Sequence, residues 1–391
     1  MAVVGSTGRS GISVFQRYRY LPGNEFQLLV DGEQCGQTFL AAIAEARSQI
    51  LFEMYLIESG RFASLLIEAL RQAAERGVQV YVLLDHFGSN GLSAEDRVRL
   101  RYPGIELVWY NPIRLLNWLT NFHRDHRKLI IVDQTVAFVG GFCITDKFWP
   151  VVDSSDQVVK APESWLDVAV KIEGPVIDQW RELFFQVWSR TAEQPLGLSS
   201  RRSPMVGSMS GRVAWANGHL HQGILRELLS RTRKANRRVW IATPYFVPSR
   251  RIRRTLLRAA KRGVDVRVLL PGPKTDHPGV RFASWRYYKQ LLHYGVRIYE
   301  YQPRFIHAKV ILADDWVSIG SCNLDHWNQR WNLEANQEVH DPRFARCVQE
   351  FFQSSFVESE EQNLRDWLQP LWYRRLLAYI WGRVDTWLRR L

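Results

Sequence analysis

The chain has 391 residues, 46% of them hydrophobic, and carries a formal net charge of +13. This composition excludes a disordered chain, and the charge favours a polyanionic partner, either nucleic acid or an anionic membrane surface. The four cysteines are scattered without a CxxC pair, a spacing that suits neither a disulfide framework nor a zinc site and favours a reducing compartment. Neither a signal peptide nor an apolar run of about 20 residues is recognisable, so we expect no membrane-spanning helix.

The first half of the chain alternates predicted helices and strands. Residues 50–57 are predicted to form an apolar strand, 66–84 an amphipathic helix followed by a strand, and 104–110 another strand. Gly77 is placed to end the helix, because glycine tolerates the left-handed conformation that follows a helix C-terminus.

The second half repeats this order of features. IRRTLLRAAKRGVDVRVLL at 252–270 matches the helix and strand of the first half, and Gly263 again ends the helix. Strands predicted at 239–247 and 295–301 take the places of the other two strands. Several segments in the same order indicate a duplication. Alternation of helix and strand predicts an α/β fold of two duplicated units, each a mixed sheet flanked by helices, packed about a pseudo-twofold axis.

Composition predicts the boundaries of these units. The segment TAEQPLGLSSRRSPMVGSMSGRV is rich in Ser, Gly, Pro and Arg, as linkers are. We expect an N-terminal extension over 1–24, a first unit over 25–190, a linker over 191–213, a second unit over 214–360 and a C-terminal amphipathic helix over 366–391.

Each half contains one copy of the pattern HxKxxxxD. The copies consist of His126, Lys128 and Asp133, and of His307, Lys309 and Asp314. Residues two apart on a strand point to the same face, so each histidine and its lysine are expected to project together. The apolar residues between lysine and aspartate predict a strand that is buried on both faces.

A pair of His-Lys groups suits phosphate-ester chemistry. Histidine is both a nucleophile and an acid near neutral pH, and lysine can balance the charge of phosphate oxygens. One histidine can attack phosphorus while the other protonates the leaving alcohol and later deprotonates the incoming one. The pattern therefore predicts phosphoryl-group transfer through a phosphohistidine, with no metal and no cofactor. A single His-x-Lys on a surface strand would more simply be a solvated pair; two copies at matching places favour the catalytic interpretation.

The two motifs, each followed by a small-residue turn (GGFC at 140–143 and GSCN at 320–323), resemble the HKD signature of the phospholipase D superfamily. Within it, the chain is similar to the bacterial cardiolipin synthases, particularly the shorter B type, at DVAVKIEGP (167–175) and NLEAN (332–336). The resemblance implies two phospholipase D-like domains.

The resemblance also implies roles for individual residues. His126 would be the nucleophile and His307 the general acid and base, although the reverse assignment is open. Lys128 and Lys309 would bind the phosphate, and Asn323 would add a hydrogen bond to it.

Further residues have supporting roles by resemblance. Glu334 is expected to orient His307, and Asp167 to orient His126. Asp133 and Asp314 are expected to anchor strand ends, through fold-stabilising ion pairs. Cys143 stands where the family often has Asn, which predicts an asymmetric site because a thiol is a weak hydrogen-bond donor.

The C-terminal segment and the charge distribution bear on the partner. The chain has 16 tryptophans, which suit either a large core or a membrane interface. On a helix over 371–391, one face is apolar and Arg374, Arg375 and Arg389 lie opposite, which favours a helix in an anionic membrane interface over one docked on the protein. The expected apolar face consists of Tyr373, Leu376, Leu377, Ile380, Val384, Trp387, Leu388 and Leu391. Leu115, Leu116, Trp118 and Leu119 are expected to line the mouth of the site or, alternatively, a buried helix.

From these features the resemblance implies a phosphatidyltransferase that forms cardiolipin from two phosphatidylglycerol molecules and releases glycerol. A peripheral location on the cytoplasmic face of the cell membrane, without nucleic acid, is expected; the oligomeric state is left open. The alternatives are a hydrolytic phospholipase or nuclease of the same superfamily, and a binding protein with a relic site.

Overall fold

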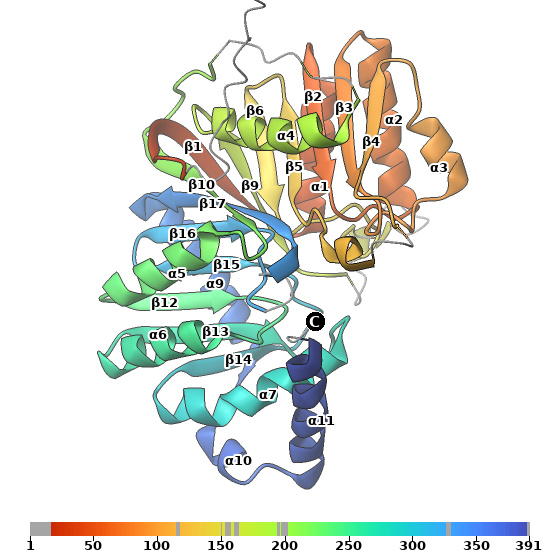
Figure 1. Cartoon of the computed structure of the whole chain (residues 1–391). Helices are drawn as coiled ribbons and strands as arrows, with labels where there is room; N and C mark the ends of the chain where they lie inside the picture. The colour runs from red at the N-terminus through yellow and green to blue at the C-terminus, as the bar shows by residue number, and fades with distance from the viewer. Residues whose placement is uncertain are drawn as a thin grey trace, which may run out of the picture.

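The computed structural model describes residues 17–114, 118–149, 151–152, 158–159, 164–193, 196, 202–325 and 330–388. It is an α/β structure in which each half of the chain forms one unit (Figure 1). None of the helices in these ranges is both long enough and apolar enough to cross a bilayer.

The first unit contains one set of strands and helices. Its strands are β1 (Leu21–Val30), β2 (Gln49–Met54), β3 (Gln79–Asp85), β4 (Ile105–Tyr110), β5 (Lys128–Val132), β6 (Val136–Gly140), β7 (Val151–Val152), β8 (Val158–Val159) and β9 (Val168–Glu173). Its helices are α1 (Gly32–Ala44), α2 (Arg61–Glu75), α3 (Ala94–Arg99), the 3-10 turn η1 (Trp118–Phe122) and α4 (Ile177–Thr191).

The second unit repeats the plan. Its strands are β10 (Met209–Asn217), β11 (His221–Gln222), β12 (Arg238–Ala242), β13 (Asp265–Pro271), β14 (Arg297–Tyr301), β15 (Val310–Ala313), β16 (Trp316–Gly320), β17 (Leu333–His340) and β18 (Ser359–Glu361). Its helices are α5 (Gly223–Lys234), α6 (Arg250–Lys261), α7 (Pro278–His293), α9 (Pro342–Val357), α10 (Leu364–Leu368) and α11 (Trp372–Leu388).

Strand order confirms that the two units are alike. The first unit reads β1-β9-β6-β5-β2-β3-β4 and the second reads β10-β17-β16-β15-β12-β13-β14. In both, three parallel strands follow antiparallel ones. Gly77 and Gly263 have φ of +87° and +86° directly after the C-caps of α2 and α6, so the predicted helix ends are confirmed.

The two sheets are joined into one. β1 pairs antiparallel with β10, and the described strands of both units form a single 16-stranded sheet. The predicted linker 191–213 therefore extends too far: its last residues, from Met209, belong to β10, because their backbone groups pair with β1 and β17. Likewise β1 starts at Leu21, inside the predicted N-terminal extension.

Three apolar clusters hold the layers together. One contains α4 and α9 side chains such as Trp180 and Phe352 and draws residues from both units, so the units share a core. A second packs α1 and α2 on the first unit's sheet, and a third packs α6 and α7 on the second unit's sheet. β5 and β15, which carry the motif apolar runs, are buried along their whole length, as predicted for strands covered on both faces.

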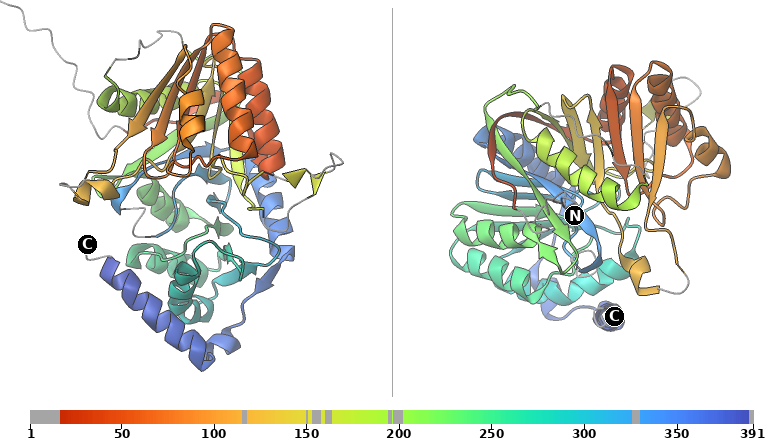
Figure 2. Two further views of the ribbon diagram at one scale, coloured as in Figure 1. Left: turned by 90° about the vertical axis from the view of Figure 1, so that its right-hand side faces the viewer. Right: turned by 45° about the horizontal axis from the view of Figure 1, so that its top comes forward.

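Helix α11 is docked along α7, as the C-terminal end of the ribbon shows (Figures 1 and 2). Leu377 and Ala378 pack against the core of the second unit. Close approach is possible because Gly279 has no side chain: a Cβ there would lie 2.5 Å from the Trp381 ring. Arg374 stacks on the rings of Trp285 and Trp367 at 5.8 Å and 5.3 Å.

This docking corrects part of the predicted membrane face. Leu377 was expected among the free apolar residues and Arg374 on the polar side, whereas both contact the protein. This rotation is favoured because Trp285 of α7 and Trp367 of α10 offer aromatic rings to the guanidinium and the core of the second unit accepts Leu377. Side chains of Trp387, Leu388, Arg389 and Leu391 lie outside the described residues.

Candidate active site

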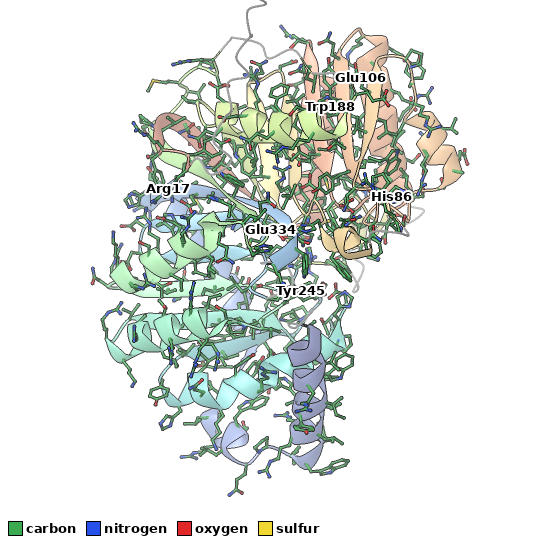
Figure 3. All side chains as sticks on the ribbon, in the orientation of Figure 1. Arg17, His86, Glu106, Trp188, Tyr245 and Glu334 are labelled. Atoms are coloured by element: carbon green, nitrogen blue, oxygen red, sulfur yellow. The ribbon has the colours of Figure 1, made fainter. Side chains whose placement is uncertain are left out.

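A cavity of about 540 Å³ lies where the two units meet. His126 and His307 both line it, together with Cys143 and Asn323 from the two small-residue turns. In Figure 3, Glu334 and Tyr245 lie in this region between the upper and lower ribbons. The structure thus brings both motif histidines to one cavity, as predicted.

Backbone hydrogen bonds between the units fix each histidine. The His126 amide donates to the Leu333 carbonyl (3.0 Å), and the His307 amide donates to the Leu166 carbonyl (2.7 Å). Both histidines precede a buried strand, so the strand holds the motif on one side and the other unit holds it on the opposite side. The backbone of each histidine is therefore fixed by the contact between the two units.

Each histidine is paired with a carboxylate of the opposite unit, the reverse of the expected pairing. Nδ1 of His126 lies 2.9 Å from the nearer carboxylate oxygen of Glu334, and Nδ1 of His307 lies 2.6 Å from Asp167. The predicted pairing of Glu334 with His307 and Asp167 with His126 is wrong. The reason is topological: Glu334 follows Leu333, which is bridged to the His126 segment, and Asp167 follows Leu166, which is bridged to the His307 segment.

The carboxylates set the orientation of the rings. When Nδ1–H donates to a carboxylate, Nε2 keeps its lone pair and is available for attack or proton transfer. Both carboxylates are buried and receive further bonds: the Ser321 hydroxyl donates to Glu334 (2.5 Å), and the Val168 amide donates to Asp167 (2.7 Å). At each of the two histidines, a buried carboxylate therefore orients the imidazole, as it does in other catalytic histidine–carboxylate pairs.

Both histidines are poised in the neutral form. Burial lowers the pKa of His307 to about 4, and the Lys309 charge lowers this pKa further while Asp167 opposes it. Burial also lowers the pKa of His126, against the Glu334 carboxylate. A neutral imidazole is the form that can act as nucleophile or base.

The two motif lysines are buried next to the motif histidines. Nζ of Lys128 donates to the His126 carbonyl (2.5 Å), and Nζ of Lys309 donates to the His307 carbonyl (2.6 Å). Lys309 also lies 2.8 Å from Nε2 of His307. Burial, with the nearby Lys128 charge, lowers the pKa of Lys309 to about 8. Two buried ammonium groups favour an anion between them.

The two turns differ as predicted. Both polar side-chain atoms of Asn323 are buried and have no hydrogen-bond partner in the described part of the chain. Cys143, at the matching place, is buried and its Sγ contacts the Gly141 carbonyl at 3.7 Å. An amide without a partner in a cavity indicates a polar ligand, because such groups are normally paired.

Asp133 and Asp314 lie at the far ends of β5 and β15, away from the cavity. Asp133 accepts backbone hydrogen bonds from Arg47, Ser48 and Gln49 at 2.7–2.9 Å. Asp314 accepts the corresponding bonds from three consecutive amides, of Asn236, Arg237 and Arg238, at 2.9–3.0 Å. Their anchoring role is confirmed, but backbone amides rather than ion pairs supply most of the contacts.

Some residues near the histidines were missed by the motif alone. The Tyr55 ring lies 4.6 Å from His126 and 4.9 Å from Nζ of Lys128, and Trp165 lies 5.4 Å from His307. Tyr55 follows β2 directly and Tyr245 lies three residues after β12, so the two tyrosines are not at equivalent positions and alignment of the two halves does not pair them. Of the segment expected at the mouth, the side chains of Leu115, Leu116, Trp118 and Leu119 lie outside the described residues, while Phe122 lines the cavity.

The fold and the paired His-Lys groups define a phospholipase D-type enzyme built from two like units. The family model for the cardiolipin synthase, phospholipase D-like domain matches residues 39–188 and 228–356. The chain belongs to this family and is an enzyme of the phosphatidyltransferase type.

Named relatives of two types match it. Cardiolipin synthase A of Pseudomonas entomophila is 34% identical over 88% of this chain and 71% of its own length. Cardiolipin synthase B of Salmonella typhi is 34% identical over 87% of this chain and 82% of its own length. Identity therefore does not separate the A type from the B type that the sequence motifs suggested.

Solved structures with the same fold have low sequence identity. Phosphatidylserine synthase of Haemophilus influenzae superposes with a TM-score of 0.67 at 13% identity, covering 93% of this chain and 94% of that one. Polyphosphate kinase of Porphyromonas gingivalis has a TM-score of 0.55 at 13% identity and is covered over 53% of its chain. At this identity the likeness establishes the fold alone.

Proposed function

We propose that this protein forms cardiolipin from two phosphatidylglycerol molecules and releases glycerol. The observation that carries the proposal is the common cavity of His126 and His307, each ring held by a carboxylate from the other unit. The names of the cardiolipin synthase relatives support the choice of lipid.

In the first step, Nε2 of His126 attacks the phosphorus of one phosphatidylglycerol. The P–N bond forms as the P–O bond to glycerol breaks, and His307 gives its proton to the leaving oxygen. Burial and the Lys309 charge favour neutral His307, whereas the negative charge of a bound phosphodiester favours its protonated form. Lys128, Lys309 and Asn323 hold the non-bridging oxygens.

In the second step, the head-group hydroxyl of another phosphatidylglycerol attacks the same phosphorus. His307 takes the hydroxyl proton, the new P–O bond forms, and the bond to His126 breaks. Cardiolipin leaves and both imidazoles return to their first state. In both steps, the two lysines balance the negative charge of the non-bridging phosphate oxygens.

The proposed location is the cytoplasmic face of the membrane, with the protein bound peripherally to anionic phospholipid. Exposed apolar side chains of α11 support this, among them Trp372, Tyr379 and Ile380 at 75%, 65% and 44% exposure. Arg375 and Arg383 are exposed on the same helix and suit anionic head groups. All three views place the C-terminal end of α11 next to η1, whose residue Phe122 lines the cavity (Figures 1 and 2).

One incubation separates the alternatives. Purified protein is mixed with phosphatidylglycerol vesicles in the presence of a chelator, and lipids and glycerol are quantified by mass spectrometry, with plasmid DNA in a parallel tube. We expect cardiolipin and glycerol in equal amounts. Phosphatidic acid without cardiolipin would indicate a hydrolase, and cleaved DNA with unchanged lipid would indicate a nuclease.

A further inference from the structure

One acidic side chain of the cavity has no part in the chemistry above. Asp276 lies in the loop between β13 and α7, after the carboxyl end of a parallel strand, where ligands of α/β sheets usually bind. Its Oδ2 accepts a hydrogen bond of 2.5 Å from the Tyr245 hydroxyl. Its Oδ1 is buried and has no hydrogen-bond partner in the ranges that the structure describes.

The first unit shows what a structural aspartate looks like at this end of the sheet. Asp85, which ends β3, accepts from the amides of Phe87, Gly88 and Asp125 and pairs with Arg124. Both of its oxygens are therefore used to hold loops. Asp276 accepts one hydroxyl through Oδ2, and the His277 ring lies 3.8 Å from the same oxygen, so the buried Oδ1 is the atom that the fold does not explain.

The chemistry of a carboxylate limits what can meet this oxygen. An ionised carboxylate only accepts hydrogen bonds, so the ligand group must be a donor. It repels phosphate oxygens, which are drawn instead to Lys128, Lys309 and Asn323. A cationic head group is disfavoured because Arg124 and Lys147 already line the cavity. A neutral hydroxyl satisfies each condition.

The position of Asp276 points to the alcohol side of the reaction. Among the charges that act on His307, Asp276 is one of those that raise its pKa, against the larger lowering by burial and Lys309. His307 is the group that handles the leaving and the entering alcohol in the proposed mechanism. The unpaired oxygen of Asp276 therefore lies near the histidine that exchanges protons with the leaving and the entering head-group hydroxyls.

We propose that Oδ1 of Asp276 accepts a hydrogen bond from the hydroxyl that neighbours the reacting oxygen of a glycerol head group. This inference rests on the proposed function and names the head-group feature that its site selects, a vicinal diol. In leaving glycerol, the carbon that bears the departing oxygen is bonded to a carbon with a hydroxyl, and in the attacking phosphatidylglycerol a hydroxyl likewise stands on the carbon next to the one that bears the nucleophilic hydroxyl. One subsite therefore serves both steps.

A competition between two alcohols tests the subsite. The full-length protein receives phosphatidylglycerol vesicles with equal concentrations of 1,2-propanediol and 1-propanol, and the two phosphatidyl alcohols are quantified by mass spectrometry. The wild type should favour the diol, and Asp276→Ala should reduce the product ratio at least about tenfold, the loss expected for a hydrogen bond to a charged group. Both alcohols attack the same phosphatidyl-enzyme, so the ratio does not depend on the amount of folded protein or on the first step.

Three comparisons complete the test. Asp276→Asn keeps one oxygen acceptor without the charge and should give an intermediate ratio. Lys289→Ala changes an exposed side chain of α7 that does not line the cavity, and should leave the ratio unchanged. When 1,3-propanediol replaces 1,2-propanediol, the wild type should lose most of its preference, because the second hydroxyl is no longer vicinal.

Several outcomes would overturn the subsite. They are a wild type without preference for the vicinal diol, an unchanged ratio in Asp276→Ala, and a wild-type preference for ethanolamine over both alcohols. A folded Asp276→Ala that forms neither product would place Asp276 in the chemistry instead of in a subsite. If the wild type forms no phosphatidyl alcohol and no cardiolipin, the proposed function itself fails.

Discussion

At the scale of single residues, each catalytic histidine depends on a carboxylate from the opposite unit. His126 is oriented by Glu334 and His307 by Asp167. Motif spacing identified the two histidines and the family resemblance identified the two carboxylates, but each carboxylate was paired with the histidine of its own half. The pairing depends on which backbone segments meet across the interface, and spacing along one half carries no information on that contact.

The duplicated turns have diverged one residue at a time. Gly141 leaves room for Asp167, since a Cβ there would lie 2.5 Å from its carboxylate oxygen. The matching Ser321 instead donates its hydroxyl to Glu334. Cys143 and Asn323 differ at the matching position, so the side-chain amide that we propose to bind phosphate is present in the second unit only.

Lys309 is expected to lower the stability of the folded protein. Its pKa is lowered from 10.5 to about 8, so the folded state disfavours the ammonium form that both states hold at pH 7. That penalty corresponds to about 3 kcal/mol. Between pH 8 and 10.5 the unfolded chain binds more protons at this site, so the penalty fades as pH rises.

Lys309→Met should therefore raise the free energy of unfolding at pH 7 by about 3 kcal/mol and abolish cardiolipin formation. The measurement is urea unfolding of both proteins at pH 7 and above pH 10. The difference should shrink at the higher pH. A variant less stable than the wild type at pH 7 would show that the buried ammonium group stabilises the fold.

At the scale of elements, helix α11 has one face that packs on the protein and one that is exposed. Leu377, Ala378 and Gly382 are turned to α7, and the Gly382 carbonyl accepts from Arg286 (2.8 Å). The opposite side exposes Trp372, Tyr379 and Ile380. Amphipathicity predicted this helix, but it could not separate a face that docks on protein from one that is left to the membrane.

Substitution on the exposed face tests the membrane role better than removal of the helix. Deletion of 371–391 would also uncover Trp285 and Trp367, which Arg374 covers. The double variant Tyr379→Asp, Ile380→Asp should reduce binding to phosphatidylglycerol vesicles about tenfold or more. It replaces apolar groups by negative charges, which the anionic lipid repels. Sedimentation with vesicles measures the effect, and the melting temperature should stay close to that of the wild type.

A matched pair of substitutions controls for the added charge. Leu65→Asp and Val98→Asp change exposed apolar residues on α2 and α3, away from α11. They should leave vesicle binding nearly unchanged. Equal losses in both double variants would attribute the effect to net charge and refute a specific role for α11.

At the scale of the whole molecule, the two units are one body. Their sheets join through β1 and β10, and the core that includes Trp180 and Phe352 spans both. The catalytic constellation needs both units, since each supplies one histidine and the carboxylate for the other. The expected pseudo-twofold arrangement is present, with the added feature that the sheet continues through its centre.

His126→Ala and His307→Ala should each abolish cardiolipin formation, because attack and proton transfer each need an imidazole that a carboxylate holds in position. An equimolar mixture of the two variants should also be inactive, since the crossed pairs form within one chain. Activity is measured as cardiolipin released from phosphatidylglycerol vesicles. Full activity of either single variant would contradict the two-histidine mechanism, and recovery in the mixture would indicate exchange of units between chains.

The sequence by itself determined the duplication, the buried motif strands, the six motif residues and the family, because hydrophobic periodicity and motif spacing are local properties. The crossed carboxylate pairs, the rotation of α11, the strand that begins inside the predicted linker and the free oxygen of Asp276 were decided only by the tertiary structure. Each of these depends on contacts between segments that are far apart in the sequence, or on a hydrogen bond that is left unmade. Such contacts arise only when two units pack against each other and the backbone groups at their interface find partners.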